Sequence, residues 1–359
     1  MLGMAGTGPF DSDQTHGIAG RIVWGMSPLA LLALLLAAAV TYDFVNGFQD
    51  SANIVATMIA SQAMSARGAL LLAATGCLAG PFVVGVAVAH TIGSEVLDPK
   101  AITIAVAVAA LLAATGWNLA AWYFGIPVSS SHALIGGLVG AGFSEGGASA
   151  VLAPGVTKVA ISLVLSPLLG FVVALLVMRL TLWLLSGATP RANVFLNRSQ
   201  IVTAAALAIA NGANDAQKTV GVIAMGLLLL GFTASFTVPW WSIALSASAL
   251  SLGTAAGGGR VARTLGSRFY RVRPIHGFTS QATSALVMLA ASIAGGPVSS
   301  TQVVSLSIVG AGAAERRSKV RWGLLGEIAI AWLLTVPASA LLAMPLHAGL
   351  EALLRHGGA

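Results

Sequence analysis

The sequence predicts an all-α polytopic membrane protein, made of two inverted-topology repeats whose broken helices meet at a central site, with about 10–12 membrane segments. Three observations lead to this prediction. Of 359 residues, 57% are hydrophobic and only 8% are charged, too few charges to cover a water-soluble surface. Apolar stretches long enough to cross a bilayer recur along the chain. Two polar motifs each occur twice, once in each half, as internal repeats require.

The apolar stretches include 29–45, 69–89 and 101–115. They indicate helices, because the strands of a membrane barrel would alternate polar and apolar residues. The net charge of +7 does not indicate nucleic-acid binding, since the basic residues sit in short loops where they orient a membrane protein. The single cysteine, Cys77, excludes an intramolecular disulfide. We therefore expect a multi-pass membrane protein, in contact with lipid.

The first repeated motif combines amides with a carboxylate. It reads NGFQDSANIVA at 46–56 and NGANDAQKTVG at 211–221, which places Asp50 and Asp215 165 residues apart. Polar clusters inside a membrane are costly and usually serve a substrate or an ion. A cluster that occurs once per half predicts one central site made by both halves.

The second repeated motif follows a helix-breaking proline. It reads GIPVSSSHALIGGLVGAG at 125–142 and GGPVSSTQVVSLSIVGAG at 295–312, with Pro127 and Pro297 170 residues apart. The nearly constant offset of the two motifs sets the boundaries of the repeats. They give an N-terminal extracytoplasmic tail (1–26), a first repeat (27–185), a linker (186–198), a second repeat (199–345) and a C-terminal tail (346–359).

The charges of equivalent loops predict that the repeats are inverted. Residues 90–100 carry two acids and one lysine, whereas 257–274 carry five arginines and no acid. Residues 143–154 carry one acid and no base, whereas 315–321 are strongly basic. Basic loops stay in the cytoplasm, so equivalent loops lie on opposite sides of the membrane. Five crossings per half satisfy this pattern and leave both termini outside; re-entrant hairpins for the serine-rich segments are the alternative.

Each proline is followed by a run of hydroxyl side chains. A broken helix leaves unpaired N–H groups at the start of its second piece, and these groups attract an anion. Two such ends facing each other would hold a tetrahedral oxyanion from both sides; the alternative for one run alone is ordinary helix capping. The predicted anion ligands are Ser129, Ser130, Ser131, Ser299, Ser300 and Thr301.

Asp50 and Asp215 do not favour an anion by themselves, so they indicate a bridging cation. Amide oxygens are suitable ligands for a hard cation such as Na⁺, although they can also bond to unwound backbone. The predicted amide ligands beside the two carboxylates are Asn46, Asn53, Asn211, Asn214 and Gln217.

Lys218 is the main difference between the halves. Aligning the repeats on their aspartates places Lys218 opposite Asn53, so one half carries a fixed positive charge where the other has an amide. We expect Lys218 to balance charge at the site; the alternative is a lysine that extends to the membrane interface. His132, directly after the first hydroxyl run, is a candidate proton carrier or a neutral helix histidine.

These four motifs resemble those of the inorganic phosphate transporter family, the Pit-type phosphate symporters. The resemblance rests on 46–53, 127–132, 211–219 and 297–301, and it covers nearly the whole chain. It implies a bacterial-like, dimeric importer of inorganic phosphate in the plasma membrane that needs no cofactor and no resident metal. The cargo it implies is free phosphate or a metal–phosphate complex.

The details of the motifs favour proton coupling. The NDAQK form is similar to that of proton-coupled bacterial members, whereas sodium-coupled members tend to have NDVAN. Gly76 and Gln281 lie about where sodium-coupled members often carry a glutamate, and Gln49 and Gln302 also depart from the family pattern.

We therefore expect a secondary active symporter for phosphate driven by protons, with sodium coupling or sulfate transport as alternatives. An intramembrane hydrolase using Ser131 and His132 is disfavoured, because adjacent helical residues point about 100° apart. A passive anion channel is also disfavoured, because channels seldom place carboxylates beside their anion donors. The expected protein is thus not an enzyme.

Overall fold

The computed structural model describes residues 26–187, 189, 191–257, 273–320 and 322–356. The predicted N-terminal tail and most of the basic loop at 257–274 lie outside these residues. The described chain is helical, with no strand beyond one isolated β-bridge between Leu97 and Val151. This confirms the all-α prediction.

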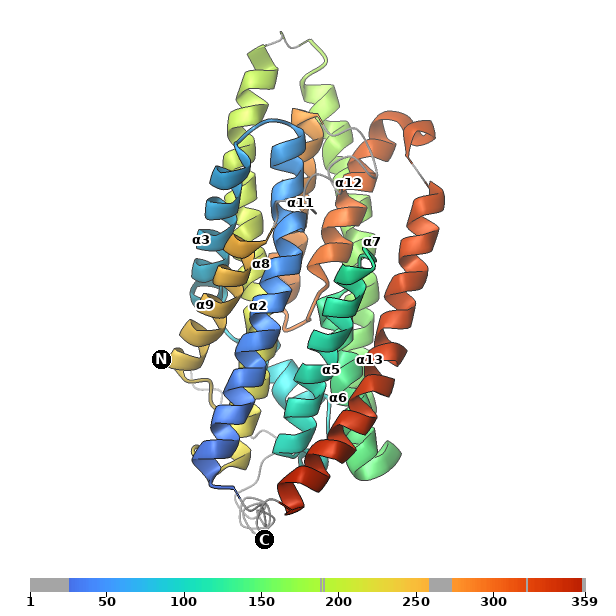
Figure 1. The fold of residues 1–359 in the computed structure, drawn as a ribbon. Coiled ribbons are helices and arrows are strands. Elements are labelled where there is room, and N and C mark those ends of the chain that lie inside the picture. Colours follow the sequence, from blue (N-terminus) through green and yellow to red (C-terminus); the bar gives the residue numbers. More distant parts are fainter. Residues whose placement is uncertain (1–25, 188, 190, 258–272, 321, 357–359) are drawn as a thin grey trace, which may run out of the picture.

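The helices run along the chain in a simple order (Figure 1). Within the described residues, four short turns of helix link them: η1 (Thr91–Glu95), η2 (Pro99–Ala101), η3 (Gly147–Ala150) and η4 (Arg317–Lys319). The α-helices are α2 (Pro28–Ala60), α3 (Ala66–Val84), α4 (Ala87–His90), α5 (Ile104–Tyr123), α6 (Ser130–Gly146), α7 (Ala153–Leu184), α8 (Arg191–Leu229), α9 (Trp240–Ala256), α11 (Pro274–Ile293), α12 (Ser300–Arg316) and α13 (Trp322–His356).

The long helices of the described chain form two series of matching lengths. Helices α2, α3, α5, α6 and α7 have 33, 19, 20, 17 and 32 residues. Helices α8, α9, α11, α12 and α13 have 39, 17, 20, 17 and 35 residues. Helix α8 already begins within the predicted linker, and α13 continues through most of the predicted C-terminal tail.

Side-chain caps mark the starts of α2, α3, α5, α6 and α12. Ser27, Ser65 and Thr103 cap α2, α3 and α5, each accepting a hydrogen bond from the backbone N–H three residues later. Ser129 and Ser299 do the same for α6 and α12. Such caps satisfy N–H groups that a helix leaves unpaired at its start. The first hydroxyl of each serine-rich run thus has the capping role that the sequence allows.

The glycine of each amide motif permits close helix packing. A Cβ atom at Gly47 on α2 would lie 2.1 Å from the carbonyl oxygen of Leu250 on α9. A Cβ atom at Gly212 on α8 would lie 2.3 Å from the carbonyl oxygen of Cys77 on α3. Small residues let membrane helices approach this closely. The two amide motifs are therefore packed in equivalent ways, α2 against α9 and α8 against α3.

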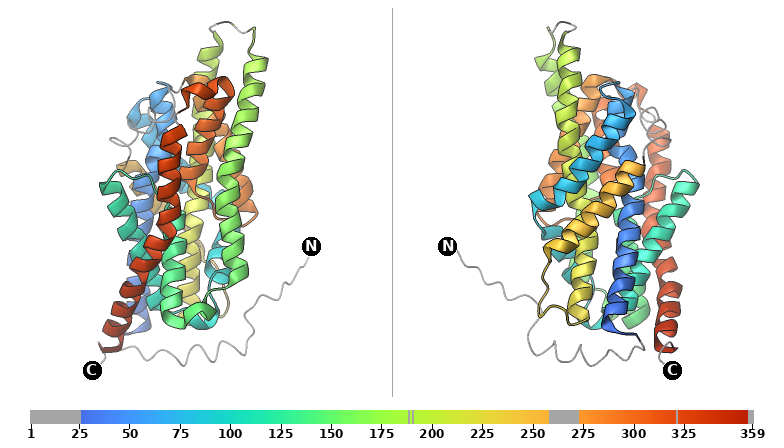
Figure 2. Two further views of the ribbon diagram at one scale, coloured as in Figure 1. Left: turned by 90° about the vertical axis from the view of Figure 1, so that its right-hand side faces the viewer. Right: turned by 60° about the vertical axis from the view of Figure 1, so that its left-hand side comes forward.

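The serine-rich motifs form the turns of two helical hairpins. Helix α5 reverses into α6 through Gly125, and α11 reverses into α12 through Gly295; these glycines have positive φ values of 69° and 73°, which residues with a side chain rarely adopt. Helices α6 and α12 have 17 residues each, fewer than the roughly 20 needed for a full crossing. The starts of both short helices lie in the middle of the bundle (Figure 2), as re-entrant hairpins require.

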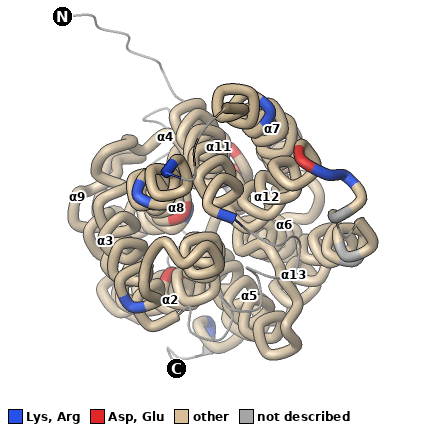
Figure 3. Tube along the Cα trace, turned by 90° about the horizontal axis from the view of Figure 1, so that it is seen from above, with Lys and Arg blue, Asp and Glu red and all other residues tan. Residues whose placement is uncertain are grey.

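The outer surface suits a lipid environment. Five helices of the described chain are long and apolar enough to cross a membrane: Pro28–Ala60, Ala66–Val84, Ile104–Phe124, Ala153–Leu184 and Ile328–Arg355. Helix α7 shows the pattern, since Ile161, Val164 and Leu176 are all more than half exposed. Viewed from above, charged residues are few along the described trace (Figure 3). Apolar groups face outward while polar side chains are buried inside, which is the arrangement of a multi-pass membrane protein.

Candidate central site

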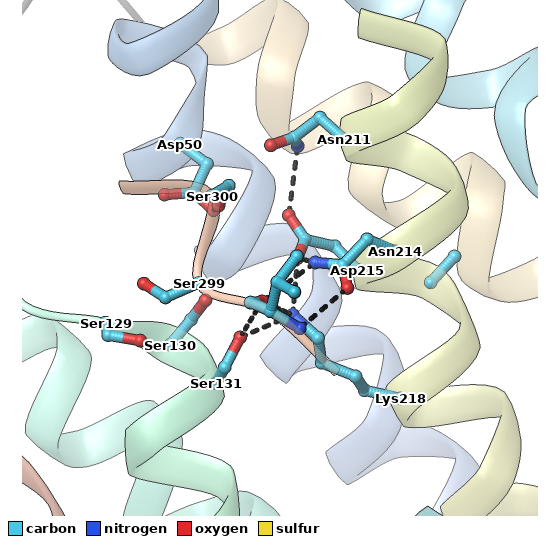
Figure 4. Close-up of polar contacts among 12 residues, drawn as sticks. Asp50, Ser129, Ser130, Ser131, Asn211, Asn214, Asp215, Lys218, Ser299 and Ser300 are labelled. Carbon is cyan, nitrogen blue, oxygen red and sulfur yellow. Dashed lines mark hydrogen bonds and ion pairs between the residues drawn. The ribbon is translucent and has the colours of Figure 1, made fainter. Parts of the chain in front are cut away.

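The repeated motifs meet where α2, α6, α8 and α12 come together (Figure 4). Helices α2 and α8 supply the carboxylates and amides from their middle turns, whereas α6 and α12 supply hydroxyls from their first turns. Nearly all of these side chains are buried. The two hairpins thus deliver two positive helix ends to one point inside the bundle.

Asp50 accepts hydrogen bonds from the second half of the chain. The Ser300 hydroxyl donates to Asp50 Oδ2 at 2.7 Å, and the Thr301 hydroxyl lies 3.1 Å from Asp50 Oδ1. Within α2, Asn53 Nδ2 donates to Asp50 Oδ1 at 2.8 Å and also contacts Thr301 Oγ1 at 2.9 Å. The start of α12 is therefore bound to the Asp50 carboxylate.

Lys218 lies inside the site and does not extend to the membrane interface. Its side chain is 1% exposed, and its ammonium contacts Asp215 Oδ1 at 2.6 Å. The same ammonium donates to the Ser131 hydroxyl at 2.5 Å and to the Val298 carbonyl at 3.1 Å. It thereby joins a carboxylate of the second half to the first turn of α6. A lysine buried in this way does not reach the surface of the bundle, and its role in balancing charge stays a prediction.

Two asparagines complete the surroundings of Asp215. Asn214 Nδ2 donates to the Val298 carbonyl at 2.9 Å, and Asn214 Oδ1 accepts from the Val298 N–H at 3.1 Å. Asn214 Nδ2 also donates to Asp215 Oδ1. Asn211 donates to Asp215 Oδ2 at 2.9 Å. Asn214 therefore bonds to the unwound backbone before α12, which is the structural role that the sequence left open for an amide.

The two halves are joined crosswise at the site. Asp50 of the first half bonds to hydroxyls of the second, and Lys218 of the second half bonds to a hydroxyl of the first. The pairing is not symmetric, because the second half presents an ammonium where the first presents the Asp50 carboxylate and Asn53. This asymmetry is the one that the alignment of the motifs predicts.

The remaining predicted residues lie at or beside the cluster. His132 Nδ1 lies 2.7 Å from Ser129 Oγ, and this half-buried ring has no contact with either site carboxylate in the described chain. Gln217 accepts a hydrogen bond from the Val88 N–H of α4 and is thus directed away from Asp215. Asn46 is fully buried.

Several atoms of the motif amides have no hydrogen-bond partner among the described residues. They are both side-chain polar atoms of Asn46, Oδ1 of Asn211 and Nε2 of Gln217. Burying an unpaired amide is costly. Asn46 and Asn211 occupy the same position in the two motifs, so their unpaired oxygens are suited to water or a small cation.

Asp43 is a buried carboxylate that the motif analysis misses. It is 0% exposed, and it accepts hydrogen bonds from Thr219 at 2.6 Å and Ser246 at 2.5 Å. It thereby links α2 to α8 and α9. An acid within an apolar span is itself a signal of a functional or structural role. Asp43 escapes a search for repeats because the aligned residue of the second half is Ala208.

The arrangement is suited to binding and release of ions. Two carboxylates and one ammonium leave an excess of one negative charge if both aspartates are ionised. A buried excess charge favours binding of a proton or another cation. Ser131 and His132 do not pair with each other, because the Ser131 hydroxyl contacts Lys218 and Val298 while the His132 ring contacts Ser129.

Comparisons with known proteins identify the family. The model of the phosphate transporter family matches residues 46–343. A probable low-affinity inorganic phosphate transporter of Rhizobium meliloti is 42% identical over 314 residues, covering 87% of this chain and 94% of the relative. A protein of Bacillus subtilis with the same description is 37% identical over 318 residues, covering 88% and 95% of the two chains.

A solved structure shares the fold. It is described as the sodium-dependent phosphate transporter, and it superposes with a TM-score of 0.83 over 90% of this chain and 100% of its own, at 23% identity. The matched proteins are transporters and not enzymes. The chain is thus a multi-pass protein of the plasma membrane, and it belongs to the phosphate transporter family.

Proposed function

We propose that the protein is a symporter that takes up inorganic phosphate together with protons. The observation that supports this most directly is the buried Lys218 ammonium, which bonds to both Asp215 and Ser131. A fixed internal cation beside the hydroxyls neutralises one carboxylate without sodium. The descriptions of the relatives from Rhizobium meliloti and Bacillus subtilis favour phosphate as the substrate.

Phosphate would bind between the first turns of α6 and α12. The proposed donors are the hydroxyls of Ser130, Ser131, Ser300 and Thr301 with the N–H groups of both helix ends, while Ser129 and Ser299 hold those ends in shape. Hydroxyls and helix N-termini bind phosphate without adding charge. The Lys218 ammonium can follow Ser131 toward the anion, because a lysine is a flexible phosphate ligand.

Competition for these donors would couple the proton to phosphate. Ser300 and Thr301 now bond to Asp50. When Asp50 takes up a proton it becomes a weaker acceptor, and the two hydroxyls are released for phosphate. The proton also removes the repulsion between this carboxylate and the anion. Proton and phosphate therefore favour each other's binding, which is what symport requires.

The charge balance explains why more than one proton is expected. A divalent phosphate with two carboxylates and one ammonium leaves about three negative charges in a buried site, which is prohibitive. Protons on Asp50 and on phosphate itself would lower this excess to about one. His132 remains a proposed route for the proton, through its contact with Ser129.

Sodium coupling is the second candidate. The unpaired oxygens of Asn46 and Asn211 favour it, since amide oxygens and carboxylates bind Na⁺ well. Lys218 argues against a sodium ion beside Asp215, because the ammonium already occupies that position. Sulfate is a weaker substrate candidate, because it carries no proton at neutral pH to share with an aspartate.

We also infer that residues 27–185 and 199–345 are inverted repeats. The packing of α2 on α9 is matched by that of α8 on α3, and the packing of α6 on α13 is matched by that of α12 on α7. Helices α2 and α8 run in opposite directions (Figure 1). The inversion is tested with two single variants, Ser149→Cys and Ser318→Cys, both at exposed positions. In intact cells, a membrane-impermeant maleimide should label the Ser149→Cys variant, and it should label the Ser318→Cys variant only after permeabilisation. Labelling of both from one side would refute the inversion.

Phosphate uptake into proteoliposomes tests the transport proposal. An inward proton gradient should accumulate ³²P-phosphate above equilibrium, and a protonophore should abolish the accumulation. Excess sulfate should compete weakly. Equilibration without accumulation would instead indicate a channel, and equal competition by sulfate would refute selectivity for phosphate.

A further inference from the structure

A second cluster of ionisable side chains lies at the opposite end of α6 from the central site, beside the C-terminal part of α13. Glu145 lies at the C-terminal end of α6, and His347 and Glu351 lie one turn apart on α13. One ligand atom from each residue falls within 4.8 Å of the others. His347 is 1% exposed, whereas Glu145 and Glu351 are 20% and 26% exposed. The cluster is therefore buried at the imidazole and open toward the two carboxylates.

The imidazole of His347 faces the carboxylates with an unpaired nitrogen. Its Nδ1 atom lies 3.0 Å from the Ser144 hydroxyl. Its Nε2 atom lies 3.1 Å from Glu145 Oε2 but makes no hydrogen bond in the described chain. If Nδ1–H donates to Ser144, the Nε2 lone pair points toward acidic oxygens. That arrangement needs a positive charge between them, either a proton on the ring or a metal ion.

The equivalent position of the second half also pairs a glutamate with a histidine, but its third charged group is an arginine. Glu315, 170 residues after Glu145, ends α12 and also meets a buried histidine, His276, at 2.9 Å. There the third group is Arg273, which forms an ion pair with Glu315. The arginine supplies positive charge beside the histidine and the glutamate.

At the first-half cluster the third group is instead another carboxylate. Glu351 forms an ion pair with Arg355, whose own side chain is 69% exposed. Two carboxylates and a histidine thus share one arginine at the rim, leaving one excess negative charge if the ring is neutral. One imidazole nitrogen and two carboxylate oxygens from two helices form a ligand set that zinc-class divalent ions accept.

We propose that Glu145, His347 and Glu351 form a binding site for a divalent cation of the zinc class. A tetrahedral ion bound at about 2.0–2.2 Å needs ligand atoms roughly 3.3–3.6 Å apart. The Nε2–Oε2 separation of 3.1 Å is already close to this range, and rotation of the Glu351 side chain brings in the third ligand. The fourth position is left for water. The bound ion connects α6, which leads to the central site, with α13.

The site is tested by titrating purified full-length protein with zinc chloride in phosphate-free buffer after treatment with a chelator. Calorimetry should give one saturable Zn²⁺ per chain. Glu145→Gln and His347→Gln should each weaken binding at least about tenfold. The matched control is Glu315→Gln, which removes the equivalent carboxylate of the second half and should leave the affinity unchanged. Asp50→Asn should also leave it unchanged, because the central site is separate.

Two further measurements keep the test decisive. If His347→Gln fails to fold, Glu351→Gln at the more exposed rim gives the same comparison. Cobalt(II) in place of zinc should show the intense visible absorption of a tetrahedral nitrogen–oxygen site, lost in Glu145→Gln. Absence of saturable binding, or binding that is unchanged in all three ligand variants, would overturn the proposal and indicate an imidazolium–carboxylate pair.

Discussion

Replacing Lys218 with asparagine perturbs the charge balance of the central site most directly. The change gives position 218 the same amide that the first half has at the aligned residue, Asn53. It removes the Lys218 ammonium, whose side chain is 1% exposed, from beside the Asp215 carboxylate, whose side chain is 0% exposed. Breaking a buried ion pair by removing one partner costs about 3–5 kcal/mol, because the other charge is left uncompensated. The hydrogen bonds to Ser131 and Val298 are lost as well.

The assay combines thermal unfolding in detergent with ³²P-phosphate uptake in proteoliposomes. Lys218→Asn should be strongly destabilised and should lose proton-driven uptake. Adding Asp215→Asn should recover much of the stability, since no charge is then left unpaired, but should not recover transport. Lys218→Arg should transport poorly, because a planar guanidinium does not replace a compact ammonium. A Lys218→Asn protein with normal stability and normal sodium-free uptake would refute the reasoning.

Three other predictions address the remaining groups. Replacing Ser130 and Ser300 together with alanine should weaken phosphate binding by about 1.5–3 kcal/mol per lost bond, measured by calorimetry against Ser149→Ala as an exposed control; an unchanged affinity would exclude these hydroxyls. Asp50→Asn should abolish gradient-driven uptake while phosphate binding persists, so wild-type uptake rates would remove its coupling role. Asp43→Asn removes one of two acceptors for buried hydroxyls and should lower the free energy of unfolding by about 1.5–3 kcal/mol; an unchanged melting curve would contradict this.

The sequence predicts much of the fold because the bilayer restricts the possible structures. The apolar stretches at 29–45, 69–89 and 101–115 predict α2, α3 and α5, and the glycine–proline turns locate both hairpins. The sequence does not decide between crossing and re-entrant serine-rich segments, because both satisfy the same loop charges. That choice depends on the reversal at Gly125 and Gly295 and on the shortness of α6 and α12.

The central site was predictable where its residues repeat. The pairing of Asp50 with Ser300 and of Lys218 with Ser131 joins residues 250 and 87 positions apart, and motifs alone do not specify such contacts. Gln217 shows the opposite case, since a motif residue turns to the backbone of α4. The repeats do not point to Asp43, because the second repeat has no acid at the aligned position. Repeated motifs thus identify site residues that both halves share. A polar residue present in only one half, such as Asp43, is identified by its burial in the structure.

Phosphate uptake by wild-type protein in proteoliposomes, with independently imposed gradients of H⁺ and Na⁺, decides whether protons drive transport. With Lys218 as the internal cation, an inward proton gradient alone should drive accumulation in sodium-free buffer, faster at acid pH, and an added sodium gradient should have little effect. Strict dependence on Na⁺, with no accumulation from the proton gradient, would contradict proton coupling.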